Sequence, residues 1–385
     1  MNLRLKASGR AGHYVTQPTG YKAFIPNGLP PHAPDLQIDA DMQALLSDAD
    51  RALGRLDGSI QTLPNPDLFV LMYVRKEAVL SSQIEGTQSS LADILKAEAH
   101  LFEPNRPNDV REVINYIRAM HHGLARLADL PVCTRLITEL HAELMREVRG
   151  QERNPGEVRR SQNWIGHGGC NLSDASFVPP PPHEVPSALS DLEKFVLSES
   201  PLPDLIKIGL IHVQFETIHP FLDGNGRVGR LLITLLLCAR GILSQPVLYI
   251  SHYFKRHRAA YYEHLQAVRD DGSWEAWLKF FLRGVAEVSG EATLTSRQIV
   301  SLRKRHRQVI VERLGRSAGN GLLLLEHLFS HPVVSVNDVA RRLNVTHAGA
   351  NQIVGRMEQI GILTEMTGRT RNRAFRYGDY IDLFQ

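Results

Sequence analysis

The sequence predicts a mainly α-helical protein with small β elements, on three observations. First, residues 36–290 carry apolar residues at helical spacing over most of their length, including the stretches 205–218 and 231–239. Second, glycine and proline are frequent in residues 1–35, which we expect to run as an extended arm over the surface. Third, residues 317–385 combine three short helical patterns with two β-prone runs, as in a winged helix-turn-helix.

Composition limits the classes of protein to consider. The chain has 385 residues and a net charge of +3, too small to indicate a nucleic-acid-binding protein by itself. Its three cysteines, Cys133, Cys170 and Cys238, form no CxxC pair, so neither a disulfide framework nor a zinc site is indicated. We therefore expect a reducing, cytoplasmic location. The start of the chain lacks the apolar core of a signal peptide, and run 231–239 is far shorter than the roughly 20 residues of a membrane span, so no membrane association is expected.

The most informative segment runs from His219 to Arg230, with the sequence HPFLDGNGRVGR. It lies between two helical patterns, so it is predicted to be a loop that leads into a helix N-terminus. Such a terminus presents unpaired backbone N–H groups and the positive end of the helix dipole, and it attracts phosphate. Taken alone, a turn rich in Gly, Asp and Asn is more often only a turn. Twelve contiguous matching positions favour a phosphate site with its own base.

The residue types in this segment suit that chemistry. The unperturbed pKa of histidine lies near neutrality, so His219 could remove a proton from an attacking hydroxyl, whereas Asp223 is an oxygen ligand suited to Mg²⁺. Arg227 and Arg230 share a helix face and can bind phosphate oxygens in forked geometry. Asn225 adds a neutral donor. Three glycines would let the backbone approach a phosphate closely: Gly224, Gly226 and Gly229.

These residues resemble the signature of the Fic family, HPFx(D/E)GNGRxxR, at every defined position. The resemblance implies a Fic-fold helical bundle that transfers AMP from ATP, with Mg²⁺, to a Ser, Thr or Tyr hydroxyl of a target protein. It implies that His219 is the base, that Asp223 holds the metal, and that Arg230 binds the γ-phosphate. The related Doc-type kinases carry a lysine in the glycine segment, which this chain lacks. The residues expected to bind the nucleotide within the signature are Gly224, Asn225, Gly226, Arg227, Val228, Gly229 and Arg230.

A second motif lies upstream, in the segment Ser81–Gly86. It resembles the inhibitory (S/T)xxxE(G/N) motif of some Fic proteins, in which the glutamate pairs with the second signature arginine. By that resemblance Ser81, Glu85 and Gly86 are inhibitory residues, and Glu85 would compete with the γ-phosphate for Arg230. In an arbitrary protein, Glu85 would be read as a solvated residue near a helix end. A further alternative is that Glu85 orients water and removes AMP from modified targets.

Three further features of the sequence predict contacts with the target protein or the nucleotide. Two β-prone runs, 159–166 and 175–178, suggest a hairpin at the position of the Fic flap, which would hold a target by strand addition along residues 162–178; a plain surface hairpin is the alternative. Tyr262 is a candidate contact on the adenine side, although aromatic residues of this region are more often core. Glu216 lies three residues before His219, on the same helix face, and is a candidate neighbour of the nucleotide.

The predicted organisation has five parts. They are an extended arm (1–35), an N-terminal helical region with the inhibitory motif (36–110), a Fic catalytic core (111–290), a basic linker helix (291–316) and a winged-helix domain (317–385). Winged helices bind DNA, other proteins or a second copy, so DNA contact and a homodimer both remain open. Self-modification is also possible. The competing functional class is a DNA-binding regulator whose Fic domain acts as a sensor.

Overall fold

The computed structural model describes residues 9–61, 63, 66–99, 107–148, 152–166, 169–369 and 372–384. The N-terminal part contains β1 (Gly12–Thr16), β2 (Lys22–Pro26), α1 (Ala40–Gln61), α2 (Pro66–Ile84), α3 (Leu91–Glu98), α4 (Asn108–Arg126) and α5 (Thr134–Leu144). The middle contains α6 (Val185–Leu197), α7 (Asp204–Ile218), α8 (Asn225–Ala239), α9 (Ser251–Arg256), α10 (Arg258–Asp271) and α11 (Trp274–Leu314). The C-terminal part contains α12 (Ala318–Ser330), β3 (Val333–Ser335), α13 (Val336–Leu343), α14 (His347–Gln359), β4 (Thr364–Glu365), β5 (Ala374–Arg376) and α15 (Gly378–Ile381).

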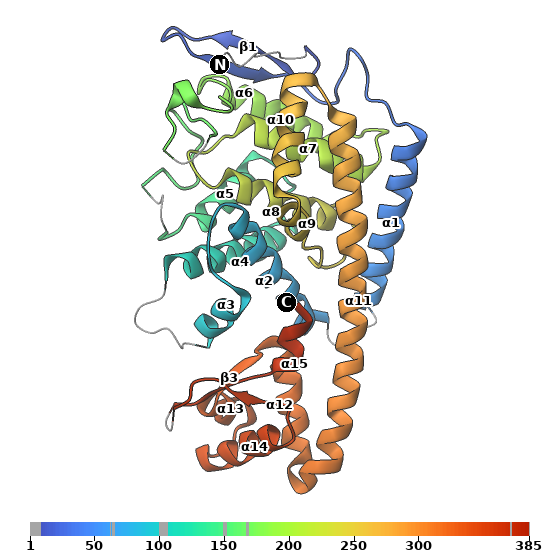
Figure 1. Cartoon of the computed structure of the whole chain (residues 1–385), viewed down its shortest axis with the longest axis vertical. Helices are drawn as coiled ribbons and strands as arrows, with labels where there is room; N and C mark the ends of the chain where they lie inside the picture. The colour runs from blue at the N-terminus through green and yellow to red at the C-terminus, as the bar shows by residue number, and fades with distance from the viewer. Residues whose placement is uncertain are drawn as a thin grey trace.

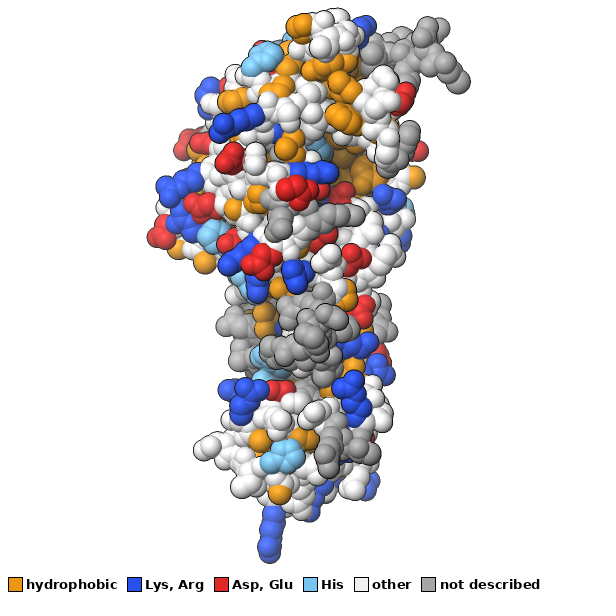
Figure 2. Space-filling model, turned by 90° about the vertical axis from the view of Figure 1, so that its left-hand side faces the viewer, with side chains coloured by type: hydrophobic (Ala, Val, Ile, Leu, Met, Phe, Trp, Pro, Cys, Tyr) orange, Lys and Arg blue, Asp and Glu red, His pale blue; other side chains and the backbone are white. Residues whose placement is uncertain are grey.

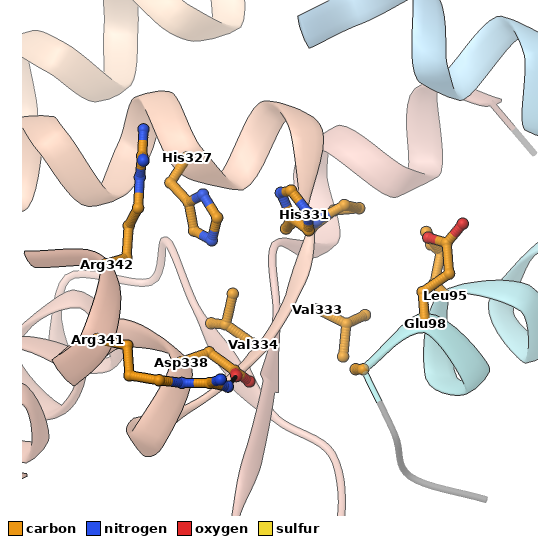
Figure 3. Close-up of a pocket in the computed structure, with 11 residues that line it drawn as sticks. Leu95, Glu98, His327, His331, Val333, Val334, Asp338, Arg341 and Arg342 are labelled. Carbon is orange, nitrogen blue, oxygen red and sulfur yellow. Dashed lines mark hydrogen bonds and ion pairs between the residues drawn. The ribbon is translucent and has the colours of Figure 1, made fainter. Parts of the chain in front are cut away.

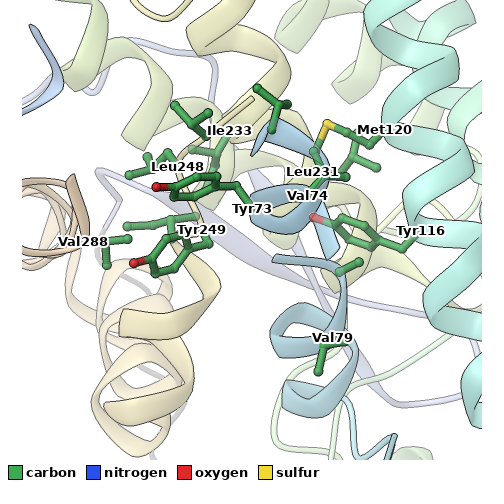
Figure 4. Packing of buried hydrophobic residues seen from close by; sticks show 14 of the residues in the cluster. Tyr73, Val74, Val79, Tyr116, Met120, Leu231, Ile233, Leu248, Tyr249 and Val288 are labelled. Carbon is green, nitrogen blue, oxygen red and sulfur yellow. The ribbon is translucent and has the colours of Figure 1, made fainter. Parts of the chain in front are cut away.

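Helix α7 forms the centre of the upper bundle. Every residue from Leu205 to Ile218 is buried, including polar ones such as His212 and Glu216. Helix α8 packs beside it, and Leu231 and Ile233 of α8 meet Tyr73 of α2 and Tyr116 of α4 in the core (Figure 4). The loop between α7 and α8 is therefore anchored at both ends by buried helices, so that its position is fixed by the core.

Helix α11 joins the two ends of the molecule. It runs beside α1 in the upper bundle and continues without a break down to the winged-helix part (Figure 1). The boundary predicted at residue 290 thus lies inside one helix, and the basic linker is its lower half. Arg303 and Arg307 there pair with Glu326 of α12, at 2.8 and 2.9 Å. These two arginines hold the winged helix onto α11.

The predicted extended arm contains a β-hairpin that the sequence analysis did not anticipate. Strands β1 and β2 pair antiparallel, with Tyr14 opposite Phe24. Phe24 is fully buried; its backbone N–H donates to Val178 O at 2.9 Å, and its ring lies 5.8 Å from that of Phe177. Glycine and proline flank the strands, which explains why composition alone suggested an arm. The hairpin covers the inner side of the predicted flap.

The C-terminal part has the predicted winged-helix arrangement. Its three short strands form an antiparallel sheet in the order β3-β5-β4. Ser335 caps α13 through a capping box with Asp338, Asn344 takes a left-handed conformation after α13, and Thr346 caps α14. The C-terminal turn packs back on the bundle, where the Phe384 ring lies 5.2 Å from that of Tyr73 on α2.

Figure 2 shows the molecule as a wide upper part that narrows toward the winged helix, with acidic and basic side chains interspersed on this face. Among the residues that the structure describes, no helix has the length and apolar character needed to cross a membrane.

Candidate active site

The signature loop begins with His219, which ends α7 in a left-handed conformation (φ 49°, ψ 61°). A residue with a side chain adopts that conformation at a cost of about 1–2 kcal/mol, so it needs support from its surroundings. The support comes from the predicted flap. Arg159 Nε donates to His219 O at 2.9 Å, and Asn163 Nδ2 donates to the same oxygen at 3.2 Å. The backbone N–H of Arg159 also binds Pro220 O at 2.9 Å.

The imidazole of His219 is neutral. Burial, together with the positive charges of Arg269 and Arg159, lowers its pKa to about 3. Its Nδ1 lies 3.4 Å from Glu216 O, and a carbonyl oxygen can only accept, so Nδ1 carries the proton. The lone pair on Nε2 is then available to take a proton, as the predicted role as base requires.

Asp223 and Asn225 shape the loop. One third of the Asp223 side chain is exposed; its Oδ1 accepts from the Gly224 N–H at 2.7 Å and its Oδ2 lies 3.5 Å from Arg153 Nη1. Asn225 is buried and uses both ends of its amide on Phe221: Oδ1 accepts from Phe221 N at 2.9 Å, and Nδ2 donates to Phe221 O at 2.8 Å. The Asn225 side chain thus closes the loop and does not serve as the free anion donor that the sequence suggested.

His141 of α5 is a positioning residue that the sequence analysis missed. Its Nδ1 accepts from the Gly156 N–H at 2.9 Å, and its Nε2 donates to Asp223 O at 3.1 Å. The ring stacks on Phe221 with centroids 3.8 Å apart and planes 5° apart. Burial lowers the pKa of His141 to about 4, which keeps the ring in this neutral, bridging form. No local motif surrounds His141, so only the fold reveals its role.

The second arginine of the signature is paired as predicted. Arg230 Nη2 donates to Glu85 Oε1 at 2.6 Å, while Nε and Nη2 bind Ser81 Oγ and Ser81 O at 2.9 and 3.1 Å. The Arg230 side chain is 1% exposed and that of Glu85 is 37% exposed. Burial alone would raise the pKa of Glu85, but the Arg230 guanidinium overrides it and holds that pKa below its usual value. The pair is therefore fully charged at neutral pH.

Helix α2 brings three polar residues to Arg230 at a spacing of four. Glu77, Ser81 and Glu85 follow one face, although α2 ends at Ile84 and Glu85 lies in the turn that Gly86 (φ 99°) completes. Glu77, which the sequence analysis did not single out, is buried and accepts from the backbone N–H and the hydroxyl of Ser251 at 3.0 and 2.5 Å. Burial raises the pKa of Glu77 to about 7.

The first signature arginine is also paired with a carboxylate. Arg227 Nη1 donates to Glu112 Oε2 of α4 at 3.1 Å, and Nη2 lies 3.6 Å from Met145 Sδ. Both side chains are almost fully buried, at 6% and 8% exposure. The structure thus pairs Arg227 with a buried carboxylate of α4, and its contact with the nucleotide stays a prediction. Glu112 was not predicted, because one glutamate in a helical pattern carries no signal of its own.

Two signature glycines leave room for carboxylates. A Cβ at Gly226 would lie 2.3 Å from Glu85 Oε1, and a Cβ at Gly229 would lie 2.4 Å from Glu216 Oε1. Gly224 has a φ of 77°, which favours glycine. Val228, between them, is fully buried in the core, so its side chain packs and does not face a ligand. Gly226 and Gly229 therefore make room for carboxylates, and the approach of a phosphate to the glycines stays a prediction.

Tyr262 lies near the rim of the site. Its side chain is partly exposed, at 38% for the residue, and the Arg258 guanidinium lies 5.5 Å from its ring centroid. Its neighbour Tyr261 is buried, with its hydroxyl 2.9 Å from His212 Nε2, and His212 Nδ1 is 3.1 Å from Gly229 O. His212 and Tyr261 support the first turn of α8, and Tyr262 alone of the two tyrosines has an accessible ring.

The predicted flap hairpin is reduced to a single bridge. Ile165 and Phe177 exchange backbone hydrogen bonds of 2.9 and 3.1 Å, and residues 167–168 lie outside the described residues. Trp164 is 40% exposed and donates to Cys170 O at 3.1 Å. Proline residues 179–182 follow, as the sequence indicated, and Arg159 Nη2 binds Pro180 O at 2.6 Å.

A cavity of about 460 Å³ lies well away from the signature, where α3 faces the winged helix (Figure 3). His327 of α12 and His331, directly after that helix, line it together with Arg342 of α13, while Asp338 there is paired with Arg341. Within the described part of the chain, no cluster of three or more His, Cys, Asp or Glu side chains is placed to hold a metal ion.

The chain matches three family models. Residues 43–125 match the Fic/DOC family N-terminal model, residues 131–237 match the Fic/DOC family model, and residues 323–376 match a model described as an HTH DNA binding domain. The first of these extends to residue 125 and so includes α4, beyond the predicted boundary at 110. The predicted combination of a Fic domain, its N-terminal region and a C-terminal helix-turn-helix is confirmed.

Two curated relatives are protein adenylyltransferases. A probable protein adenylyltransferase of Aquifex aeolicus is 41% identical over 182 residues, which make up 46% of this chain and 51% of that protein. The protein adenylyltransferase Fic of Drosophila erecta is 30% identical over 172 residues, 44% of this chain and 31% of that protein. The matched regions thus span about half of the first relative and about a third of the second.

Solved structures with the same fold include a Fic family protein of Desulfovibrio desulfuricans, with a TM-score of 0.58 at 18% identity over 89% of this chain and 97% of that chain. A Fic-domain signalling protein of Bacteroides thetaiotaomicron gives a TM-score of 0.51 at 16% identity, over 65% of this chain and 95% of that one. At these identities the likeness concerns the fold, and it confirms the predicted helical Fic architecture.

Proposed function

We propose that this member of the Fic/DOC family transfers AMP from ATP to a Ser, Thr or Tyr hydroxyl of a target protein, and that Glu85 restrains the reaction by occupying Arg230. The observation that carries the proposal is that one segment supplies a neutral base, His219, at the end of α7 and a cation held by a carboxylate, Arg230, in α8. His219 has its Nε2 lone pair available, and Arg230, eleven residues on, is held by a carboxylate that a phosphate can replace.

In the proposed transfer, His219 accepts the proton that the target hydroxyl loses. Its Nε2 takes the proton of the target hydroxyl while the hydroxyl oxygen bonds to the α-phosphorus, and the bond from that phosphorus to pyrophosphate breaks. Arg230 binds the γ-phosphate, and the backbone from Gly224 to Gly226, at the start of α8, faces the phosphates. The Asn225 side chain holds the loop closed in this scheme, and the ring of Tyr262 is available on the adenine side.

The residues present fit a magnesium ion. Mg²⁺ is commonly held by one or two carboxylates together with substrate phosphates and water, and Asp223 supplies one partly exposed carboxylate beside the helix terminus. When bound, the ion would neutralise charge on the phosphates, and His141 would keep Asp223 in place through its backbone oxygen.

Glu85 acts in this proposal as a releasable restraint. Its carboxylate and the γ-phosphate need the same guanidinium, so ATP bound while Glu85 is in place would lack its γ-phosphate anchor and would leave the α-phosphate misaligned. Glu85 lies in the turn after α2 and is partly exposed, which allows it to leave without unfolding the helix. The hydrolytic alternative uses the same carboxylate to orient water against AMP on a modified protein.

The target is proposed to pair as a strand along residues 162–178. Trp164 is exposed next to the bridge between Ile165 and Phe177, and this short bridge leaves most of the flap backbone without a strand partner among the described residues. Strand addition aligns a hydroxyl with little demand on target sequence. Self-modification would use the same surface. The three free cysteines suit the reducing cytoplasm proposed for the protein.

DNA binding is a second candidate function of the winged helix, favoured by one observation. Arg373 of the wing donates to Asn351 of α14 at 2.8 Å, so the wing and the exposed face of the second helix-turn-helix helix form one surface. If DNA binds there, its affinity should fall steeply as salt rises, because phosphate contacts release counterions. A salt titration with labelled duplex DNA measures this, and salt-insensitive or absent binding would favour the protein-binding or dimer alternative.

The activity is tested with ATP labelled on the α-phosphate, with Mg²⁺, in cell lysate and with the protein alone. Label should appear on protein with Glu85→Gly, more weakly with the unchanged chain, and not with Glu85→Gly combined with His219→Ala. Label transferred from the γ-phosphate in place of the α-phosphate would indicate a kinase. Loss of label from premodified protein, dependent on Glu85, would support AMP removal.

A further inference from the structure

A second carboxyl group, that of Glu216, faces the signature and is not satisfied by its surroundings. Glu216 lies on the buried helix α7 and is 5% exposed, and its Oε1 has no hydrogen-bond partner among the residues that the structure describes. A buried polar atom without a partner costs about 1–3 kcal/mol, so a glutamate at this position calls for an explanation. Gly229 accommodates it, since a Cβ there would lie 2.4 Å from Glu216 Oε1.

Glu216 lies close to His219, the proposed base. Its Oε2 lies 4.0 Å from His219 Nδ1, the nitrogen that carries the proton, and its backbone oxygen lies 3.4 Å from the same atom. The backbone contact is long for a hydrogen bond. A small rotation of the imidazole, or of the Glu216 side chain, would therefore exchange a weak carbonyl contact for a charged one.

The charged and titratable groups around Glu216 come from α8, from α10 and from the turn after α2. Arg230 of α8 and Arg269 of α10 favour its ionised form, whereas Glu85 beyond α2 opposes it. Tyr261 and Tyr262 of α10 also lie within its electrostatic reach. Burial is the largest influence and raises the pKa of Glu216 to about 7. The carboxyl group can thus gain or lose its proton near neutral pH, and it becomes easier to ionise when Glu85 moves away.

We propose that Glu216 is a positioning residue for the transfer reaction, whose carboxylate accepts the Nδ1 hydrogen of His219 and stabilises the imidazolium formed when Nε2 takes the target proton. This inference rests on the proposed function, because it assigns a partner to the proposed base. The need for such a partner is visible in the resting site, where burial and two arginines lower the pKa of His219 to about 3. A base works best when its pKa lies near the operating pH, and an adjacent carboxylate raises it.

The chemistry requires no further reactant. The target hydroxyl loses its proton to His219 Nε2, its oxygen bonds to the α-phosphorus, and pyrophosphate departs. Nδ1 keeps its hydrogen throughout, and Glu216 changes only the electrostatic environment of the ring. An aspartate beside a catalytic histidine acts in the same way in serine proteases, where it fixes the tautomer and stabilises the charged ring without becoming protonated.

The test compares Glu216→Gln and Glu216→Asp with the matched control Glu263→Gln, an exposed glutamate of α10, all in the Glu85→Gly background. Gln keeps the volume of Glu and removes the charge. We expect kcat to fall about 10–100-fold in Glu216→Gln with KM for ATP changed less than about twofold, since the nucleotide contacts are kept. The acid limb of the kcat–pH profile, expected below pH 7 because Glu85 is absent from this background, should disappear in this variant. Glu216→Asp should retain that limb, and the Glu263→Gln control should change neither quantity.

A second readout does not depend on activity. The hydrogen bond at His219 Nδ1, followed by NMR on histidine-labelled full-length protein above pH 7, where Glu216 is ionised, should weaken in Glu216→Gln and stay unchanged in Glu263→Gln. An unchanged kcat, or an unchanged pH profile together with an unchanged Nδ1 hydrogen signal, would overturn the assignment. If the Glu85→Gly parent transfers no AMP to any protein, the proposed function fails, and the NMR measurement still decides whether Glu216 binds the Nδ1 hydrogen of His219.

Discussion

Both signature arginines are paired with carboxylates from residues 43–125, the part that matches the Fic/DOC family N-terminal model, yet the two pairs lie in different surroundings. Arg230 meets Glu85, which is 37% exposed and lies in a turn beyond the end of α2. Arg227 meets Glu112, which is 8% exposed and lies within α4. Breaking a buried ion pair leaves an uncompensated buried charge, whereas water or phosphate can replace a partner that is exposed. The Glu85 pair is therefore suited to regulation, and the Glu112 pair to holding two regions together.

The largest effect is expected from a change that leaves both pairs intact. His219→Ala removes the base, which should lower AMP transfer about 10²–10⁴-fold while ATP affinity stays nearly the same. Transfer is measured with labelled ATP in the Glu85→Gly background, and ATP affinity by calorimetry. Activity kept above about one tenth of the parent value would rule out His219 as the base.

Removing the buried pair of Arg227 and Glu112 should lower the free energy of unfolding and should not raise AMP transfer. Glu112→Gln leaves Arg227 buried beside a neutral amide, so we expect a loss of about 3–5 kcal/mol in the free energy of unfolding. Denaturant unfolding of the full-length protein measures it. AMP transfer per folded molecule should not rise. An activated, normally stable Glu112→Gln protein would show that this pair, too, is a restraint, and the contrast between the two pairs would be lost.

Removing the partly exposed pair of Arg230 and Glu85 should instead raise AMP transfer. Glu85→Gly frees Arg230, and a coupling of about 1–3 kcal/mol implies a rise in AMP transfer of roughly 5–150-fold. Arg230→Ala should be inactive with or without Glu85, because it removes the group that both anions need. Initial rates of the two single variants and the double variant measure this dependence. Additive effects of the two changes would contradict competition for one guanidinium.

The smallest effect concerns pH and Glu77, two helical turns before Glu85. Burial raises the pKa of Glu77 from 4.5 to about 7, so its contribution to stability is complete below the unfolded value and is lost as pH rises through about 7. Glu77→Gln does not titrate. The free energy of unfolding of Glu77→Gln, relative to that of the unchanged chain, should therefore increase between pH 5 and pH 8, by up to about 3 kcal/mol. Melting curves over that range test the sign, and a difference that falls with pH would contradict it.

The sequence predicted those features that local patterns encode. The apolar run after Arg230 indicated a buried helix, the glycine segment indicated its N-terminus, and the motif around Glu85 indicated the pair with Arg230; each is present. What it could not predict depends on contacts between distant segments. His141 holds Asp223 from 82 positions away, and Glu112 reaches Arg227 from 115. Neither residue stands out within its own helix.

Predictions from local sequence patterns were less successful for two small β elements. The strands β1 and β2 are short and bounded by glycine and proline, so composition suggested an arm; the burial of Phe24 against Phe177 is what makes the hairpin stable. The flap, in contrast, had β-prone residues on both sides of a glycine turn, yet within its described part only Ile165 and Phe177 pair. Arg159 and Asn163, at its base, are instead committed to the backbone of His219.

The central claim is that Glu85 and the γ-phosphate compete for Arg230. The most direct test measures the affinities of ATP and ADP by calorimetry in His219→Ala protein, which prevents turnover, with and without Glu85→Gly. ADP lacks the γ-phosphate and serves as the matched control ligand. We predict that Glu85→Gly tightens binding of ATP clearly more than binding of ADP. Equal changes for the two nucleotides, or no change for either, would contradict competition at Arg230.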